Sequence, residues 1–446
     1  MFRTGMGIII KLTLAFFAII TGNSFESNGG DTSLQNWISE NAIEIRGLEI
    51  NEASDDLHQL EYIVANAKLV CLGESRHDAR EQFQVKHRLI KYLVEEMGFT
   101  SFMLEGSLPY CSLINDYING DGGDIDLIMA GMPGWFLWDT EEMKEIIEWM
   151  YVYNSGAGNY DKIQFFGIDI VAPNFALEQI FNFLEEHDID VLQLFEENAF
   201  ERDLIFDDSW PRSRESYASL PSSRKEELVT NYDELYEVLE QKREQYISSS
   251  SEKEYNWILR MAYCAKEANR LFSSKTNLEL GLVRESAMAE NALWIQRNLS
   301  NSGKSIIWAH NVHIAMDEFT MSIQEGTIQG MGYLIKQELK EDMVSIGASF
   351  DKGDYPEWGK SFPAADPSTL DGVLAAAGME YFLIDLKKSL DDNEVHKWLN
   401  SSQVMRAQDF DMSCIPIKSF DAMYFTSSIS HTIPNEHSSE RFRNMN

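Results

Sequence analysis

The stretch "LVCLGESRHDAR", Leu69 to Arg80, decides which fold this sequence predicts. It opens with four apolar residues, as a buried strand does, and Gly73 then interrupts the run. Glu74 and His77 follow three residues apart, where a plain turn would use Gly, Asn, Asp or Ser. A carboxylate and an imidazole at the end of a core strand indicate a functional site.

Similar runs, rich in branched and aromatic residues, predict the other strands of a buried sheet. They are "TSFMLEG" (100–106), "KIQFFGIDI" (162–170), "KSIIWAH" (304–310), "MVSIGASF" (343–350) and "YFLIDL" (381–386). Helical patterns lie between several of them, and Thr140 is the expected N-cap of one such helix. This alternation predicts an α/β fold with a mostly parallel central sheet flanked by helices.

The pattern changes along the chain and so predicts a domain organisation. Residues 174–298 are almost all helical in pattern and rich in charge, which predicts a helical insert between two parts of an α/β core, 35–173 and 299–426. Residues 427–446 form a polar tail that we expect to be loose. Residues 1–24 combine basic residues with a nine-residue apolar stretch too short to span a bilayer, which predicts a signal peptide and an exported protein, periplasmic or secreted.

Composition limits the function. The 446 residues are 44% hydrophobic and 12% aromatic, enough for a large core. The net charge of −35 argues against a nucleic-acid partner, which requires a basic surface. The four cysteines match neither a metal site nor a disulfide scaffold, although a single disulfide stays open.

Polar residues follow the predicted strands at their carboxyl ends, where open α/β sheets bind ligands. The first strand is followed by Glu74 and His77, the next by Glu105, the third by Asp169 and the fourth by His310 and His313. Because these strand ends should meet at one edge, the sequence predicts one site.

Three kinds of chemistry fit these residues. In the first, His77 activates water as a general base, and the dipole of the following helix disfavours its charged form. In the second, the histidines and carboxylates bind zinc or iron, although the sequence has neither a His-Glu-x-x-His motif nor a cysteine pair. In the third, Ser75 is a nucleophile, although His77 replaces the closing Gly of that motif.

The longer stretch "LGESRHDAREQFQVKHRLIKYLVEEMGFTSFMLEG" resembles the opening motif of the erythromycin esterase family. Further segments are similar to that family in the same order: "WDTEEMKEIIEWMYVYN" (138–154), "FFGIDI", "RESAMAEN" (284–291), "WAHNVHIA" and "MGYLIKQEL". The chain departs from the family's usual residues at Arg76, commonly Thr, at Asp78, commonly Gly, and at Lys86, commonly Arg.

The resemblance implies an α/β core with the helical insert domain over a deep cleft, and hydrolysis of a small-molecule ester, in known members a macrolide lactone. It implies His77 as the base, Glu74 and Glu105 as acidic partners, and His310 and His313 as cleft histidines. The family is regarded as needing no metal for this chemistry, and we expect no cofactor. Two alternatives stay open: a metal- or haem-binding protein of the same fold, since a wider relative of the fold binds haem iron, and an ester hydrolase or transferase of exopolysaccharide metabolism, in which some family members are placed. We further expect a set of residues to bind the substrate: Lys86, Arg88, Asp169, Trp135 and Trp138.

Overall fold

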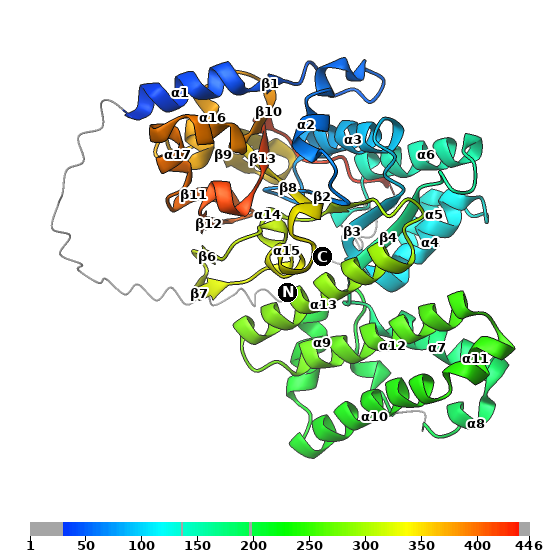
Figure 1. Ribbon diagram of the computed structural model, residues 1–446. Helices are drawn as coiled ribbons and strands as arrows, with labels where there is room; N and C mark the ends of the chain where they lie inside the picture. The colour runs from blue at the N-terminus through cyan, green and yellow to red at the C-terminus, as the bar shows by residue number, and fades with distance from the viewer. Residues whose placement is uncertain (1–29, 135–136, 196–198, 437–446) are drawn as a thin grey trace, which may run out of the picture.

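The computed structural model describes residues 30–134, 137–195 and 199–436. The predicted signal peptide therefore lies outside the described residues. Helices cover both faces of a central sheet, and a block of helices lies to one side of it, green in Figure 1. The predicted α/β class is confirmed.

The central sheet has nine strands in the order β1-β10-β13-β8-β2-β5-β3-β4, with β9 paired to β8. The strands from β13 to β4 run parallel, whereas β1, β9 and β10 pair antiparallel, so the sheet is mostly parallel as predicted. Their bounds are β1 Ile43–Glu44, β2 Leu69–Leu72, β3 Ser101–Ser107, β4 Gln164–Asp169, β5 Ser305–Trp308, β8 Met343–Tyr355, β9 Lys360–Phe362, β10 Tyr381–Asp385 and β13 Ala422–Ile429.

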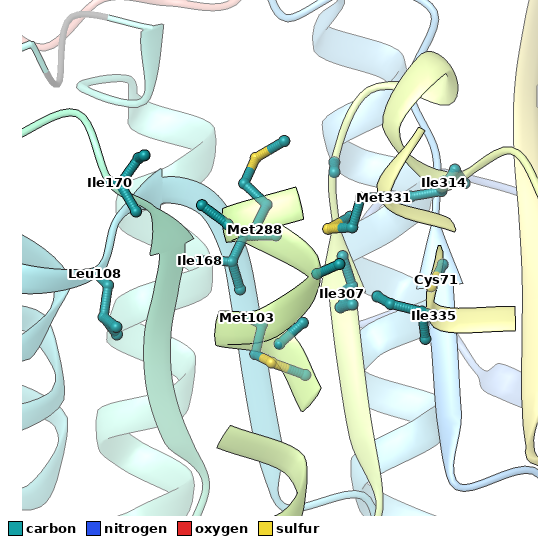
Figure 2. Close-up of a cluster of buried hydrophobic side chains, with 14 of the residues drawn as sticks. Cys71, Met103, Leu108, Ile168, Ile170, Met288, Ile307, Ile314, Met331 and Ile335 are labelled. Carbon is teal, nitrogen blue, oxygen red and sulfur yellow. The ribbon is translucent and has the colours of Figure 1, made fainter. Parts of the chain in front are cut away.

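The two faces of the sheet pack into two separate cores, which is why the strands are apolar without alternation. In β2, Val70 and Leu72 belong to the core beneath α3, whereas Leu69 and Cys71 belong to the core on the opposite face. Figure 2 shows part of this second core, where Cys71 lies near Ile335 of α15.

The helices of the α/β core cover these two faces. The Thr140 hydroxyl accepts a hydrogen bond from Met143 N (3.2 Å), so it caps α6 as expected. The bounds are α1 Gly30–Asn41, α2 Leu60–Val64, α3 Arg80–Glu95, α4 Leu108–Asn119, α5 Ile125–Gly131, α6 Glu141–Gly156, α14 Asn311–Ile314, α15 Met331–Leu339, α16 Leu370–Ala375, α17 Asn393–Leu399 and α18 Pro416–Ser419.

The segment predicted as an insert is a run of helices. Its helices are α7 Pro173–His187, α8 Ile189–Leu192, α9 Trp210–Ala218, α10 Ser222–Gln241, α11 Arg243–Ser249, α12 Glu252–Ser273 and α13 Asn277–Asn298. Within it, α12 packs on α7, α9, α10 and α13. The last helix, α13, also packs on β4 and α15, and so joins the block to the sheet (Figure 1).

A second, four-stranded sheet was not expected from the sequence. Its order is β11-β12-β6-β7, with β6 Phe319–Met321, β7 Gln324–Ile328, β11 Gln403–Ala407 and β12 Phe410–Cys414. These strands are short and three of them carry charged residues, so they lack the apolar runs that identified the central strands.

The predicted loose tail is wrong for residues 427–436. The first three residues complete β13, which lies inside the sheet between β8 and β10. After it, His431 bridges to Ala79 and Pro434 to Thr140, and Asn435 Nδ2 donates to Asp139 Oδ1 (2.8 Å). The polar composition misled the prediction because several of these residues bond their polar groups to the core, as Thr432 N does to the Asp78 carbonyl oxygen (3.0 Å).

Two further findings bear on the sequence predictions. All four cysteines are buried and free, so the open disulfide is not formed. Among residues 30–134, 137–195 and 199–436, no helix is long and apolar enough to cross a membrane.

Candidate active site

The register of the parallel strands brings four strand ends to one edge. Leu72 pairs with Trp308, and Leu104 pairs with both Trp308 and Gly167. The residues one or two positions further along each strand therefore lie side by side. They are the predicted site residues Glu74, Glu105, Asp169 and His310.

Gly73 is required by a close approach and not by a turn. A Cβ at this position would lie 2.3 Å from Asn311 Oδ1 and 3.1 Å from the Ile346 carbonyl oxygen. Asn311 is itself bonded in both directions to the backbone of Ala348, at 2.8 and 2.9 Å. The absent side chain thus lets the segment after β2 pack directly on α14.

Glu74 is a fully buried carboxylate with three donors. It accepts from Nδ1 of His77 (2.6 Å), from Nε1 of Trp308 (2.6 Å) and from Nζ of Lys86. Burial alone would raise its pKa, but the Lys86 charge and the His77 hydrogen bond outweigh burial and lower the pKa to about 2. Glu74 is therefore ionised at neutral pH.

His77 lines the cleft, and one of its two ring nitrogens is bonded to Glu74. Because Glu74 is ionised, Nδ1 carries the proton that it donates, which leaves Nε2 as the basic atom of the neutral ring. Burial lowers the His77 pKa, but the hydrogen bond to Glu74 and the charge of Glu105 raise it by more. The pKa of His77 therefore lies above the ordinary 6.5. The expectation that a helix dipole keeps this ring neutral is therefore wrong, since the nearby carboxylates dominate.

This pKa pattern predicts the pH dependence of the site. The base form of His77 disappears as pH falls through its raised pKa, so the acid limb of kcat/KM should lie above pH 6.5. Histidine-selective NMR, assigned with His77→Asn, should show His77 titrating there. An acid limb below pH 6.5 would contradict the assignment.

A second group of charges lies beside His77. Glu105 accepts from Arg284 Nη2 (3.0 Å) and His313 Nε2 (3.0 Å), and Arg284 also donates to Asp169 (2.6 and 2.9 Å). His313 Nδ1 donates to Glu285 (2.6 Å). Burial lowers the His313 pKa, but these two carboxylates outweigh burial and raise the pKa to about 10. His313 is therefore a fixed cation and not a second base.

His310 is held in the opposite state. Its Nε2–H donates to the Ser75 carbonyl oxygen (3.0 Å), and its Nδ1 accepts from Val312 N (3.3 Å). Burial, and then the nearby His77, lower its pKa to about 3. Both ring nitrogens are thus bonded to backbone, so His310 orders the loop that carries Ser75 and His77.

A cleft of about 710 Å³ lies between the sheet edge and the helical block, and six predicted site residues line it: His77, Glu105, Trp138, Asp169, His310 and His313. Glu74 is buried behind His77 and is not part of the lining. Trp138 lines the cleft and meets His77 edge-on, with ring centroids 5.7 Å apart. Trp210 and Leu282 line it from the helical block. Trp135, also predicted to bind substrate, lies outside the described residues.

Three of the predicted substrate-binding residues have other partners. Lys86 is fully buried behind Glu74, with its ammonium 3.5 Å from the Trp308 ring centroid. Arg88 is 4% exposed and bonded to Asp56 (2.8 and 3.0 Å), away from the cleft, so its prediction is wrong. Asp169 does line the cleft but is held by Arg284.

Ser75 is not placed as a nucleophile. Its side chain is fully buried, and its hydroxyl accepts from Gln82 Nε2 (2.6 Å). Gln82 Oε1 accepts in turn from Ser75 N (2.9 Å). The hydroxyl therefore points toward α3, and Ser75 is not among the residues that line the cleft.

The described part of the chain contains no group of three or more His, Cys, Asp or Glu side chains arranged to hold a metal ion. The hydrogen bonds of the two histidines explain why they are not available as metal ligands. His310 uses both nitrogens on backbone groups, and His313 uses both on carboxylates.

Sequence reasoning missed Arg284, Glu285 and Gln408 as site residues, all of which line the cleft. The first two lie on α13, and Gln408 lies in the turn between β11 and β12. The "RESAMAEN" segment contained a signal for the first pair, because an Arg-Glu pair in a helix needs partners if it is buried. Nothing in the sequence indicated Gln408.

Comparison with known proteins agrees with this arrangement. Residues 94–431 match the sequence profile of the erythromycin esterase family, which is more than half of the chain. The chain belongs to the erythromycin esterase family. The matched segment includes Glu105, Arg284 and His313 and begins after the loop that carries Glu74 and His77.

Individual relatives give the same result. The chain is 26% identical to erythromycin esterase type II of Escherichia coli over 345 residues, 72% of this chain and 79% of that one. It is 25% identical to the putative hydrolase YbfO of Bacillus subtilis, covering 85% and 88% of the two chains. A crystal structure of a Bacillus cereus protein has the same fold, with a TM-score of 0.78, 24% identity and coverage of 91% and 99%. Membership of the erythromycin esterase family makes this protein a hydrolase of that family.

Proposed function

We propose that this erythromycin-esterase-family protein hydrolyses a carboxylic ester with a water molecule activated by His77. One observation carries the proposal: an ionised, buried Glu74 holds Nδ1 of His77 and leaves Nε2 at the cleft. A raised pKa makes that nitrogen a stronger base than a free imidazole. The same carboxylate stabilises the imidazolium that forms when the ring takes a proton.

The reaction balances with His77 alone as the proton carrier. Nε2 accepts a proton from water as the water oxygen attacks the ester carbonyl carbon, and a tetrahedral oxyanion forms. When it collapses, the C–O bond to the alcohol breaks and the imidazolium returns its proton to the leaving oxygen. The products are a carboxylic acid and an alcohol, and the base is restored.

The substrate we propose is a bulky, largely apolar ester, with a macrolide lactone as the first candidate. A cleft of about 710 Å³ is large enough for a drug-sized molecule. Its walls are mostly apolar, with Trp138, Trp210 and Phe410 among them. The name of the Escherichia coli relative supports the macrolide.

Mass spectrometry of the purified protein with erythromycin and with p-nitrophenyl esters tests this function. Hydrolysis should add the mass of one water to the macrolide, or release p-nitrophenol from the aryl ester. If neither substrate is consumed faster than in buffer, the proposed esterase activity is wrong.

Ser75→Ala distinguishes activated water from an acyl-enzyme. Because the Ser75 hydroxyl bonds Gln82 and does not line the cleft, we expect kcat within about threefold of the original. Intact-protein mass spectrometry during turnover should show no acyl adduct. Loss of activity in this variant, together with an adduct on the original protein, would favour the serine mechanism.

We also propose that the protein is exported, because residues 1–24 have the composition of a signal peptide. Expression with and without these residues, followed by fractionation and N-terminal sequencing, tests this. Full-length protein retained in the cytoplasm with its N-terminus intact would contradict it.

A further inference from the structure

The turn between β11 and β12 has an unfavourable backbone conformation at the cleft. Gln408 and Asp409 make this two-residue turn, and Gln408 has a φ of +52°. A positive φ at the first turn position favours Gly, because a side chain is strained there. Strain of this kind persists only where surrounding contacts hold it.

Three hydrogen bonds tie Gln408 to the loop that carries the proposed base. Its backbone N–H donates to the Ser75 carbonyl oxygen (2.6 Å), the same oxygen that His310 bonds. Its side-chain Oε1 accepts from the backbone N–H of His77 (3.0 Å). Its carbonyl oxygen accepts from Arg76 Nη1 (2.5 Å).

Arg76 holds the turn in place through bonds to both of its residues, Gln408 and Asp409. Its guanidinium is fully buried, donates to both carboxylate oxygens of Asp78 (2.7 Å each) and to Asp409 (2.8 Å), and lies 4.4 Å from the Phe362 ring centroid. The loop and the turn are therefore one rigid unit, although they are more than 300 residues apart in sequence.

The hydrogen bond to His77 also fixes which way the Gln408 amide faces. A backbone N–H can only donate, so the side-chain atom opposite it is the oxygen and not the nitrogen. Nε2 of Gln408 donates to no other described residue, and Gln408, which is half-buried, lines the same cleft as His77. An amide donor that is open to the cleft is thus held beside the proposed base.

We infer that Gln408 is a catalytic residue of this site, whose Nε2–H donates to the oxyanion formed when His77-activated water attacks the ester carbonyl. The inference rests on the proposed function. As the carbonyl carbon becomes tetrahedral, negative charge develops on the carbonyl oxygen, and a donor fixed in advance stabilises that charge most. The donor is neutral and keeps its protons throughout, so the proton balance of the reaction is unchanged.

Two nearby groups are less suited to this role. Both nitrogens of His310 are bonded to backbone groups. Arg284 uses Nε and Nη2 on Asp169 and Glu105, and its Nη1 lies 3.4 Å from His313 Nε2. The strained turn adds to this cleft a neutral amide donor that is bonded to the loop carrying His77.

Gln408→Gly tests the inference by separating activity from stability. Gly relieves the positive φ, so the melting temperature should not fall, while loss of the amide should lower kcat by about 10²-fold with KM much less affected. Lys340→Gly is the matched control, because Lys340 also has a positive φ (+49°), is exposed and lies outside the cleft. It should keep the original kcat. If Gln408→Gly keeps kcat within about threefold, the inference is wrong.

Gln408→Glu separates donation from simple positioning of His77. This variant keeps an oxygen to accept from His77 N but loses the donor, so kcat should fall at least as far as in Gln408→Gly. A Gln408→Glu protein as active as the original would overturn the donor role.

A binding measurement keeps failure of this inference distinct from failure of the proposed function. Ethyl methylphosphonate carries a tetrahedral anionic centre like that of the reaction intermediate, and its affinity can be measured by calorimetry whether or not any ester is hydrolysed. Gln408→Gly should weaken its binding at least about tenfold relative to Lys340→Gly. Equal affinities in the two variants, or no binding to either, would overturn the inference even if esters are cleaved.

Discussion

Replacing His77 by Asn should lower kcat for ester hydrolysis by about 10²- to 10⁴-fold, the usual contribution of a general base. The Asn side chain can still donate to Glu74, but it cannot take a proton from water near neutral pH. Because the His77 side chain is 18% exposed and at the cleft, the fold should change little. Initial rates at several pH values, together with thermal unfolding, measure both effects.

His396→Asn is the matched control for this prediction. His396 lies on α17 and is not among the cleft residues, so its replacement should leave kcat unchanged. The general-base assignment fails if His77→Asn keeps full activity. It also fails if the pH dependence of kcat/KM is the same with and without His77.

The largest expected effect on stability is that of Lys86→Met. Met has a volume close to that of Lys, but it leaves the fully buried Glu74 carboxylate without its cation. Removing one partner of a buried ion pair destabilises a protein by about 3–5 kcal/mol. Burial lowers the pKa of Lys86 to about 7, so urea unfolding followed by tryptophan fluorescence should show this loss as a lower midpoint at pH 6, where the ammonium is charged.

The double variant Glu74→Gln/Lys86→Met shows whether the lone charge is the cause. With both charges gone, at least half of the lost stability should return, since a neutral pair needs far less desolvation. Activity should stay low, because His77 no longer has an ionised partner. A Lys86→Met protein that unfolds at the original midpoint would mean that Glu74 does not depend on Lys86.

Much of the central fold could be predicted because buried parallel strands have a strong local signature. Each apolar run, such as 69–72 or 343–350, fell on an observed strand. The strand β13 was missed because Ser and Thr interrupt its second half, and the polar residues after it were taken for a free tail. Their order comes from contacts with Asp139 and Ala79, which no local pattern contains.

The members of the candidate site that follow the strand ends were predictable, whereas Arg284, Glu285 and Gln408 were not. Glu74, Glu105 and Asp169 stood at strand ends, and the common edge followed from parallel pairing. Arg88 was misassigned because its spacing on α3 says nothing about Asp56, which pairs with it from another segment. No sequence pattern indicated Gln408, because its proposed role depends on a hydrogen bond to His77, which is far from it in the chain.

The sequence by itself determined that acidic and imidazole side chains gather at one sheet edge, because strand position and chain direction are local properties. Only the tertiary structure decided which of the three cleft histidines has the properties of a base. His313 is held as a cation by Glu105 and Glu285, His310 is neutral and bonded to backbone, and His77 has Nε2 at the cleft. The physical reason is that burial and through-space charge set a pKa, and both depend on segments far apart in the chain.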